Sequence, residues 1–253
     1  PIGGTYGKGG GLYLNNKVKM INVSVVDNIA NEGGGILWFP QESTDTLSNI
    51  FVSGNSASGD GGGIRTYGTT SSTIVNSQII RNTSNGGAGM YLQGISKLSN
   101  MLIYDNNATG GPTGSGGYGG GILIYGGNAS IDSTIIASNT GNSDGGGLYK
   151  VGGGSISYNF VSIIDNSGVN GGGIYNSSTA NLNNVSIINN LSTGTGDGIA
   201  SGDYYNTGGI LTVSNSNIAH NARALINEDN SQYSQALNNY WGHESGPYHP
   251  SQN

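Results

Sequence analysis

Residues 171–190 read GGGIYNSSTANLNNVSIINN, and this stretch decides the fold. It opens with three glycines followed by Ile174, and it closes with Ile187 placed three residues before Asn190. Between these points lie short alternating segments, such as 184–188, which are typical of half-buried β-strands. No amphipathic helical pattern of about ten residues is present. The stretch therefore predicts one turn of chain built from short strands.

The opening of this stretch recurs along the whole chain. A triplet of small residues followed by an aliphatic residue begins at points 24 to 32 residues apart, and such self-similarity is the signature of a repeat architecture. The strong copies are Gly9-Gly10-Gly11-Leu12, Gly33-Gly34-Gly35-Ile36, Gly61-Gly62-Gly63-Ile64, Gly87-Ala88-Gly89-Met90, Gly119-Gly120-Gly121-Ile122, Gly145-Gly146-Gly147-Leu148 and Gly171-Gly172-Gly173-Ile174. Weaker copies are Gly196-Asp197-Gly198-Ile199 and Ala224-Leu225.

The closing signature also recurs, once in each repeat. An aliphatic residue stands three places before an asparagine, and an asparagine amide that recurs once per turn can hydrogen-bond to its copies in neighbouring turns. We therefore predict a structural ladder of stacked amides, because every repeat contributes one copy. Its members are Asn28, Asn55, Asn82, Asn106, Asn139, Asn166, Asn190 and Asn221.

Period and pattern together predict an all-β, single-stranded, right-handed parallel β-helix of about nine coils over residues 1–253. Leucine-rich, ankyrin and tetratricopeptide solenoids need helices or helix-like arcs, and propeller blades need about 40 residues. With turns ~4.8 Å apart, nine coils give a rod on the order of 43 Å long. We expect 222–253 to form the C-terminal coil and cap, since terminal repeats must be covered. Surface insertions are expected at 40–45, 109–116 and 201–207.

Composition excludes several classes of protein. The 8 Lys and Arg residues are scattered and the net charge is −6, so a nucleic-acid partner is not expected. There is no Cys, and therefore no disulfide or thiolate metal site. No apolar run approaches the ~18 residues of a membrane span. The chain begins with Pro1, so we expect a mature product or a segment of a longer exported protein.

The end of the chain carries Asn238-Asn239-Tyr240-Trp241-Gly242-His243-Glu244-Ser245-Gly246-Pro247. This segment, with the Gly-Gly-Gly-Ile and Ile-x-x-Asn repeats, resembles bacterial right-handed parallel β-helix repeat surface proteins, including adhesins and autotransporter-type passenger domains. The resemblance implies an extracellular or cell-surface location and a parent chain that carries an anchoring or sorting module. It implies fold more than function, because one fold hosts many activities.

Three functions follow from this resemblance as expectations. The first is a non-enzymatic rigid stalk, adhesin or surface-assembly component that binds a glycan or a surface protein. The second is a polysaccharide lyase or glycoside hydrolase, which needs acidic and basic side chains gathered in one groove. The third is a phage or secretion-system fibre component, which trimerisation would support.

We predict no catalytic residues. Glu32 and Asp60 each precede a Gly triplet in consecutive coils and could approach one another, and Arg65 is the best candidate base beside them. A solvated turn role is the simpler interpretation of both acids. His220, His243 and His249 lack zinc-ligand spacing, so no metal or other cofactor is expected, with Ca²⁺ held by turn carboxylates as the alternative. Thr residues do not recur at fixed positions, which argues against an ice-binding face.

The residue after each aliphatic anchor forms a further row, Tyr13, Leu37, Arg65, Tyr91, Leu123, Tyr149, Tyr175 and Ala200. In a strand the neighbours of core residues point outward, so this row should lie on the surface. A tyrosine ring has an apolar face and a polar tip, which suits sugar rings or a protein partner. Tyr13, Tyr91, Tyr149 and Tyr175 are therefore our candidate binding residues, and packing that stiffens the sheet is the alternative.

Overall fold

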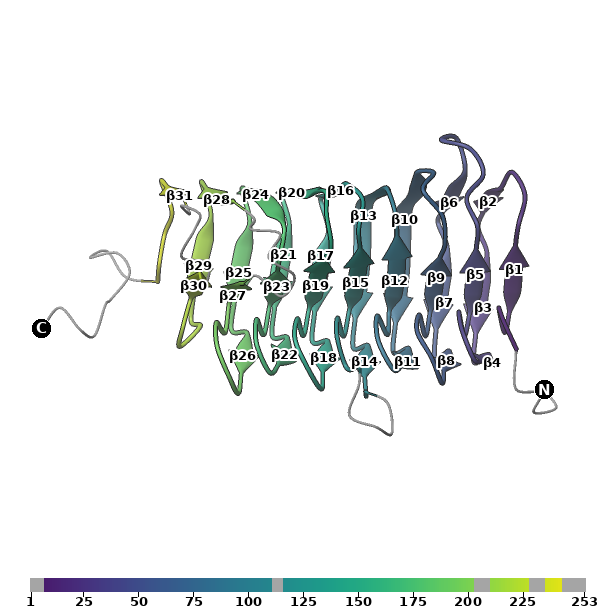
Figure 1. Ribbon diagram of the computed structural model, residues 1–253, viewed down its shortest axis with the longest axis horizontal. Helices are drawn as coiled ribbons and strands as arrows, with labels where there is room; N and C mark the ends of the chain where they lie inside the picture. Colours follow the sequence, from purple (N-terminus) through teal and green to yellow (C-terminus); the bar gives the residue numbers. More distant parts are fainter. Residues whose placement is uncertain (1–6, 111–115, 203–209, 228–234, 243–253) are drawn as a thin grey trace, which may run out of the picture.

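A computed structural model describes residues 7–110, 116–202, 210–227 and 235–242. These residues form strands and turns without a helix, and every strand pair is parallel. Figure 1 shows the chain winding from one end of an elongated body to the other, turn upon turn. This confirms the predicted parallel β-helix, or β-solenoid, whereas the hand of its winding stays a prediction.

Three stacked sheets make up the solenoid. The first sheet contains nine strands, one for each Gly triplet or its weaker copy. They are β1 (Leu12–Leu14), β5 (Ile36–Trp38), β9 (Ile64–Thr66), β12 (Met90–Gln93), β15 (Ile122–Tyr125), β19 (Leu148–Val151), β23 (Ile174–Asn176), β27 (Ile199–Ser201) and β30 (Leu225–Asn227). These nine strands bound about eight full turns, one fewer than predicted, which gives a rod of ~38 Å.

The second sheet contains 15 strands in two columns that fuse at β10 (Ser72–Ile80) and β13 (Ser96–Tyr104). One column adds β2 (Lys19–Ile21), β6 (Thr46–Ser48), β16 (Ala129–Asp132), β20 (Ser155–Asn159), β24 (Thr179–Asn183), β28 (Leu211–Ser214) and β31 (Gln235–Leu237). The other adds β3 (Ser24–Val26), β7 (Phe51–Ser53), β17 (Ile135–Ala137), β21 (Ser162–Ile164), β25 (Ser186–Ile188) and β29 (Asn217–Ala219).

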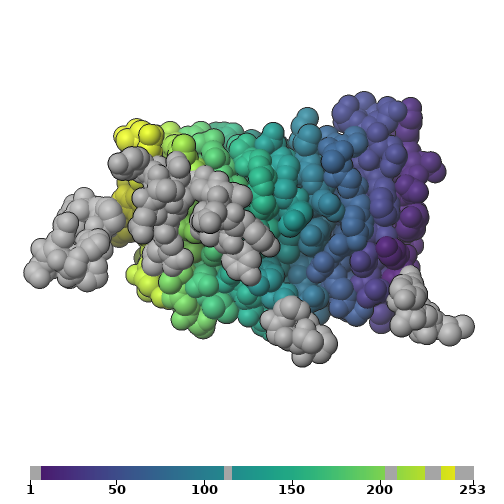
Figure 2. Space-filling model, in the orientation of Figure 1, coloured from purple at the N-terminus to yellow at the C-terminus, as the bar shows by residue number. Residues whose placement is uncertain are grey.

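The third sheet has seven two-residue strands and leads back to the Gly triplets. Its members are β4 (Ile29–Ala30), β8 (Ser56–Ala57), β11 (Thr83–Ser84), β14 (Asn107–Ala108), β18 (Thr140–Gly141), β22 (Ser167–Gly168) and β26 (Leu191–Ser192). One turn of chain therefore visits the three sheets in order. Equivalent residues of successive turns stack, as the colour bands of Figure 2 show.

The core is a single apolar column along the axis of the rod. The triplet anchors, such as Ile122 and Ile174, and the aliphatic residues before the ladder asparagines, such as Ile136 and Ile187, are fully or almost fully buried in it. Each turn contributes a few such side chains, and burying apolar area is the main favourable term in folding. The core is thin and continuous, as the 34% hydrophobic content suggests.

The eight asparagines of the predicted ladder lie directly above one another. In each of the seven steps from Asn28 to Asn221, the side-chain amide of one residue donates to Oδ1 of the next, at 2.9 to 3.3 Å. From Asn55 onward, Nδ2 also donates to the carbonyl of the aliphatic residue one turn earlier, as Asn106 does to Ile79 at 2.9 Å. This second bond explains why an aliphatic residue and an asparagine recur as a pair.

The left-handed backbone conformation occurs in the residues directly before the ladder asparagines, not in the asparagines themselves. The residue before each ladder asparagine has a positive φ, as in Asp27 (57°), Asp105 (56°) and Asp165 (56°). These three acids share one corner position, directly before a ladder asparagine. Gly and Asn are the residues that adopt this conformation most readily, and Asp tolerates it through local hydrogen bonds.

The Gly triplets are required by close contact between turns. Gly171 has φ +61°, and a Cβ on Gly173 would lie 2.6 Å from the carbonyl oxygen of Gly198. A Cβ on the middle residue, Gly172, would collide with the Leu191 carbonyl of the following turn. The triplet therefore allows one turn to lie against the next.

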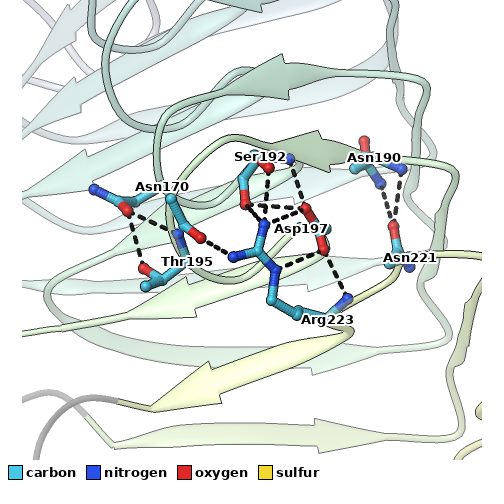
Figure 3. A network of polar contacts seen from close by, with 8 residues as sticks. Asn170, Asn190, Ser192, Thr195, Asp197, Asn221 and Arg223 are labelled. Carbon is cyan, nitrogen blue, oxygen red and sulfur yellow. Dashed lines mark hydrogen bonds and ion pairs between the residues drawn. The ribbon is translucent and has the colours of Figure 1, made fainter.

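Ala88 and Asp197 carry a side chain at the middle position of their triplets. Asp197 does so where the third sheet ends, among the described residues, at β26. Its buried carboxylate accepts hydrogen bonds from the Ser192 backbone (2.7 Å), the Ser192 hydroxyl (3.0 Å) and Nε and Nη2 of Arg223 (both 3.1 Å), as Figure 3 shows. Arg223 also donates to the carbonyls of Ser192 and Gly194. A side-chain network thus occupies the edge that an eighth strand would pair with.

The predicted cap and insertions are only partly described. Trp241 is half-buried against the last apolar layer, and Asn239 accepts from the Ser216 backbone at 3.0 Å. Residues 228–234 and 243–253 of the predicted cap lie outside the described residues, so the capping role stays a prediction. The same holds for most of the insertions at 109–116 and 201–207. In the insertion at 40–45, the Asp45 carboxylate accepts hydrogen bonds from the backbone of Val18, Gln41 and Glu42.

Candidate functional site

The outer face of the first sheet carries one aromatic ring on each of its first seven turns. Some rings follow the triplet anchor directly, and others stand two residues later, on the same outward side of the strand. We call this set the aromatic strip, and it comprises Tyr13, Phe39, Tyr67, Tyr91, Tyr125, Tyr149 and Tyr175. It runs along the long axis of the rod.

Neighbouring rings of the strip contact one another. The ring centroids of Phe39 and Tyr67 lie 5.2 Å apart and nearly parallel, and Tyr13 packs against Phe39 at 5.5 Å. Farther along, Tyr149 and Tyr175 stack at 5.2 Å. Tyr118, from the turn before β15, packs on Tyr149 at 4.8 Å. These distances are those of stabilising aromatic pairs.

Arg65 forms the charged centre of the strip. Its guanidinium lies between two rings, 4.5 Å from the centroid of Tyr67 and 4.2 Å from that of Tyr91. Nη1 donates to Asp60 at 2.6 Å, and Nε lies 4.0 Å from a carboxylate oxygen of Glu32. Arg65 thus joins the two acids that the sequence places in consecutive coils.

Glu32 is held by further partners. The Tyr67 hydroxyl donates to its carboxylate at 2.9 Å, and Lys8 Nζ lies 3.5 Å away. Two cations, Lys8 and Arg65, therefore balance two carboxylates, Glu32 and Asp60. The formal charge of this group is close to zero.

The pKa values follow from burial and from this pairing. Burial would lower the pKa of Arg65, but the hydrogen bond and charge of Asp60 outweigh it and raise the pKa above its ordinary value. Burial raises the pKa of Tyr91 to about 12, and it also raises the pKa of Tyr67. Arg65 is therefore permanently protonated and suited to hold carboxylates rather than to accept a proton.

A shallow hollow of about 250 Å³ opens beside this centre. Its lining includes Asp60, Tyr91, Tyr118, Leu123, Tyr125 and Tyr149. Apolar ring faces surround it, and one carboxylate lies at its wall. Such a combination of aromatic walls with few polar groups is typical of small-ligand sites.

The structure separates the four tyrosines that the sequence groups together. Tyr13 is 53% exposed and Tyr91 is half-buried, but Tyr149 and Tyr175 are only 4% and 6% exposed. Tyr149 and Tyr175 point outward from the main core as expected, but the expectation that they are accessible is wrong, because they join Leu123 and Ala200 in a second, smaller apolar cluster. The accessible part of the strip lies on the first five turns.

Sequence reasoning missed three members of the strip, Phe39, Tyr67 and Tyr125. It followed only the position directly after each anchor, whereas the position two residues later points to the same face. A search for one aromatic residue at either position in every repeat would have found them. The exposed ring of Tyr125, at 46%, borders the hollow.

Titratable groups outside the strip form no metal site in the described part of the chain, where no three His, Asp or Glu side chains gather as metal ligands would. The corner acids Asp27, Asp105 and Asp165 belong to different turns, and His220 stands at the same corner in a later turn. Nor do the described residues include a helix able to cross a membrane.

Comparison of the chain with protein-family models, with curated proteins and with solved structures finds no match to any of them.

Proposed function

We propose that this chain is a non-enzymatic, extracellular or cell-surface β-solenoid segment that acts as a rigid stalk or adhesin and binds glycans. The observation that carries the proposal is the aromatic strip, whose accessible rings follow the axis of the rod. Rings spaced by the ~4.8 Å rise of the turns present repeated apolar surfaces to an extended chain of sugars.

The test uses a panel of polysaccharides measured for binding and for bond cleavage. Tyr13→Ala and Tyr125→Ala remove exposed rings that the main core does not need. We expect each variant to weaken glycan binding severalfold while melting like the unaltered protein. Tyr104→Ala, on the second sheet and 41% exposed, is the matched control and should bind normally. A panel without any binder would refute the proposal.

The contact of Arg65 with Asp60 and Glu32 is the observation that favours a second candidate, a polysaccharide-degrading enzyme. Against it, Arg65 cannot accept a proton and both acids are engaged by cations. Cleavage of any glycan in the same panel, abolished by Asp60→Asn, would replace the binding proposal with the enzymatic one. A stable trimer in solution would favour the fibre-component alternative.

A further inference from the structure

The aromatic strip shifts to the later of its two positions at the turn of β15, where its ring is Tyr125. Tyr91, Leu123 and Tyr149 are register partners on β12, β15 and β19, so Leu123 stands where its two neighbours carry rings. One face of Tyr91 is covered by Arg65, which belongs to the turn before it. The hollow lies beside Leu123, with Tyr91 on one side and Tyr118 and Tyr149 on the other.

A residue without a side chain, Gly86, also leaves room beside the hollow. The residues directly before the triplets form a column, and Asp60 and Gly86 are bridged partners in it. Gly86 has no side chain, and a Cβ there would lie 3.2 Å from Asp60 Oδ1 and 3.5 Å from Leu123 Cδ1. Because Gly86 leaves this space open, the carboxylate of Asp60 borders the hollow.

The charges around the hollow restrict what it can bind. Among the described residues, its lining contains one acid, Asp60, and no cationic side chain. Arg65, which is bonded to Asp60, is 8% exposed and covered by two rings. A uronate or sulfated sugar would bring a second anion to this wall without a free cation to meet it, and burying an unpaired charge is costly.

Resting on the proposed glycan-binding function, we propose that this hollow is a specificity subsite for one uncharged pyranose ring. The sugar ring lies over Leu123, between Tyr91 and the Tyr118–Tyr149 pair. Asp60 Oδ1 accepts a hydrogen bond from a sugar hydroxyl, since among the described residues only Oδ2 of Asp60 accepts one, from Arg65. The sugar then has an aromatic wall on each side.

Leu123→Tyr tests this inference because it places a ring in the hollow. The preceding and following register partners are tyrosines, and the hollow beside Leu123 gives the larger side chain room. We expect binding of neutral glycans such as mannan, xylan and β-glucan to fall by about tenfold or more, with an unchanged melting temperature. Leu123→Ile keeps the side-chain size and should bind normally. Leu123→Phe provides a second filled variant if the tyrosine disturbs folding.

The outcomes separate this inference from the proposed function. Binding of neutral glycans that survives in both filled variants would overturn the subsite and leave the glycan-binding proposal standing. The same holds if only acidic glycans, such as alginate or polygalacturonate, bind. Competition by choline but by no neutral sugar would assign the hollow to an organic cation and also overturn the inference. Absence of all glycan binding would refute both proposals.

Discussion

At the scale of single residues, the ladder asparagines carry an unusual share of the hydrogen bonding. The buried side chain of Asn106 makes four bonds, accepting from the backbone and side chain of Asn82 and donating to Ile79 and Asn139. Each partner is itself buried or part of a strand. Loss of the amide therefore leaves several polar groups without partners and without water.

We expect Asn106→Ala to lower the free energy of unfolding by about 3 kcal/mol, since it leaves buried donors and acceptors without hydrogen-bond partners. Urea denaturation followed by circular dichroism measures the change. Asn107→Ala, at the exposed neighbouring position, should cost less than about 0.5 kcal/mol. If the two substitutions lowered the free energy of unfolding equally, the side-chain hydrogen bonds of the ladder would contribute little to stability.

Lys150 is a second residue with an exceptional environment. It is fully buried in the row that elsewhere holds Trp38, Leu92 and Ile124. Its ammonium group lies 3.0 to 3.4 Å from the carbonyl oxygens of Gly126, Val151, Gly152 and Gly153. Burial lowers the pKa of Lys150 to about 8.

This lowered pKa predicts a pH dependence with a definite sign. Between about pH 8 and the ordinary lysine value near 10.5, the unfolded chain binds the proton that the folded protein has lost, so stability rises with pH by up to about 3 kcal/mol. Urea denaturation at pH 7, 8, 9 and 10 measures the rise. Lys150→Met should abolish it. If the Lys150→Met variant kept the same rise of stability with pH, another titratable group would be responsible for it.

Residue patterns predict the ladder and the triplets because each turn repeats the same contact. They do not predict Lys150, because the residues at its position in the two preceding turns, Leu92 and Ile124, are apolar and its carbonyl partners assemble only when residues 151–153 fold back over it. They predict Arg65 beside two acids but not its position between two aromatic rings. Its partners Asp60 and Glu32 were expected to approach each other, but no sequence rule places a guanidinium between Tyr67 and Tyr91.

At the scale of elements, the packing of one turn on the next depends on the middle glycine in most triplets, although Ala88 is accommodated at this position in one turn. A Cβ on Gly146 would collide with the Ser167 carbonyl and lie 2.6 Å from that of Gly172. Gly153, in the turn after β19, has nothing within 4 Å of the same position. The two glycines therefore provide a matched pair.

Gly146→Ala should force adjacent turns apart and lower the free energy of unfolding by about 3 kcal/mol or more, as overpacking against backbone does. Gly153→Ala should be close to neutral. Thermal melting of the two variants beside the unaltered protein distinguishes them. Similar melting temperatures for both would mean that the turns separate at little cost.

Strand periodicity predicts that short strands of successive turns stack, but not how many sheets they form or where a sheet stops. The third sheet ends at β26 because Asp197 replaces the middle glycine and binds Arg223 (Figure 3). Burial would raise the pKa of Asp197, but hydrogen bonds from Arg223 and Ser192 outweigh it and hold the pKa below its ordinary value. The sequence shows this position only as a weaker copy of the triplet.

At the scale of the whole molecule, stability should be greatest near the middle of the rod and least at its ends. Each turn contacts only its neighbours, so terminal turns have fewer partners. The nine-residue strands β10 and β13 pair over eight positions, whereas Leu12 and Leu14 of β1 are only half-buried. The middle of the rod is therefore the best-supported region.

We expect backbone amides of β10 and β13 to exchange with deuterium most slowly, and those of β1 and β31 fastest. Hydrogen–deuterium exchange with mass spectrometry resolves these segments. Protection that is uniform along the rod would instead indicate a single global opening and contradict the prediction.

The direction of the asparagine ladder has a consequence for how such a chain can evolve. Every rung offers the same donor to the following turn and the same acceptor to the preceding one, from Asn28 to Asn221. A gene that duplicated or lost one whole repeat would still encode an unbroken series of matching rungs. Recombination can therefore change the length of the rod in steps of one whole turn.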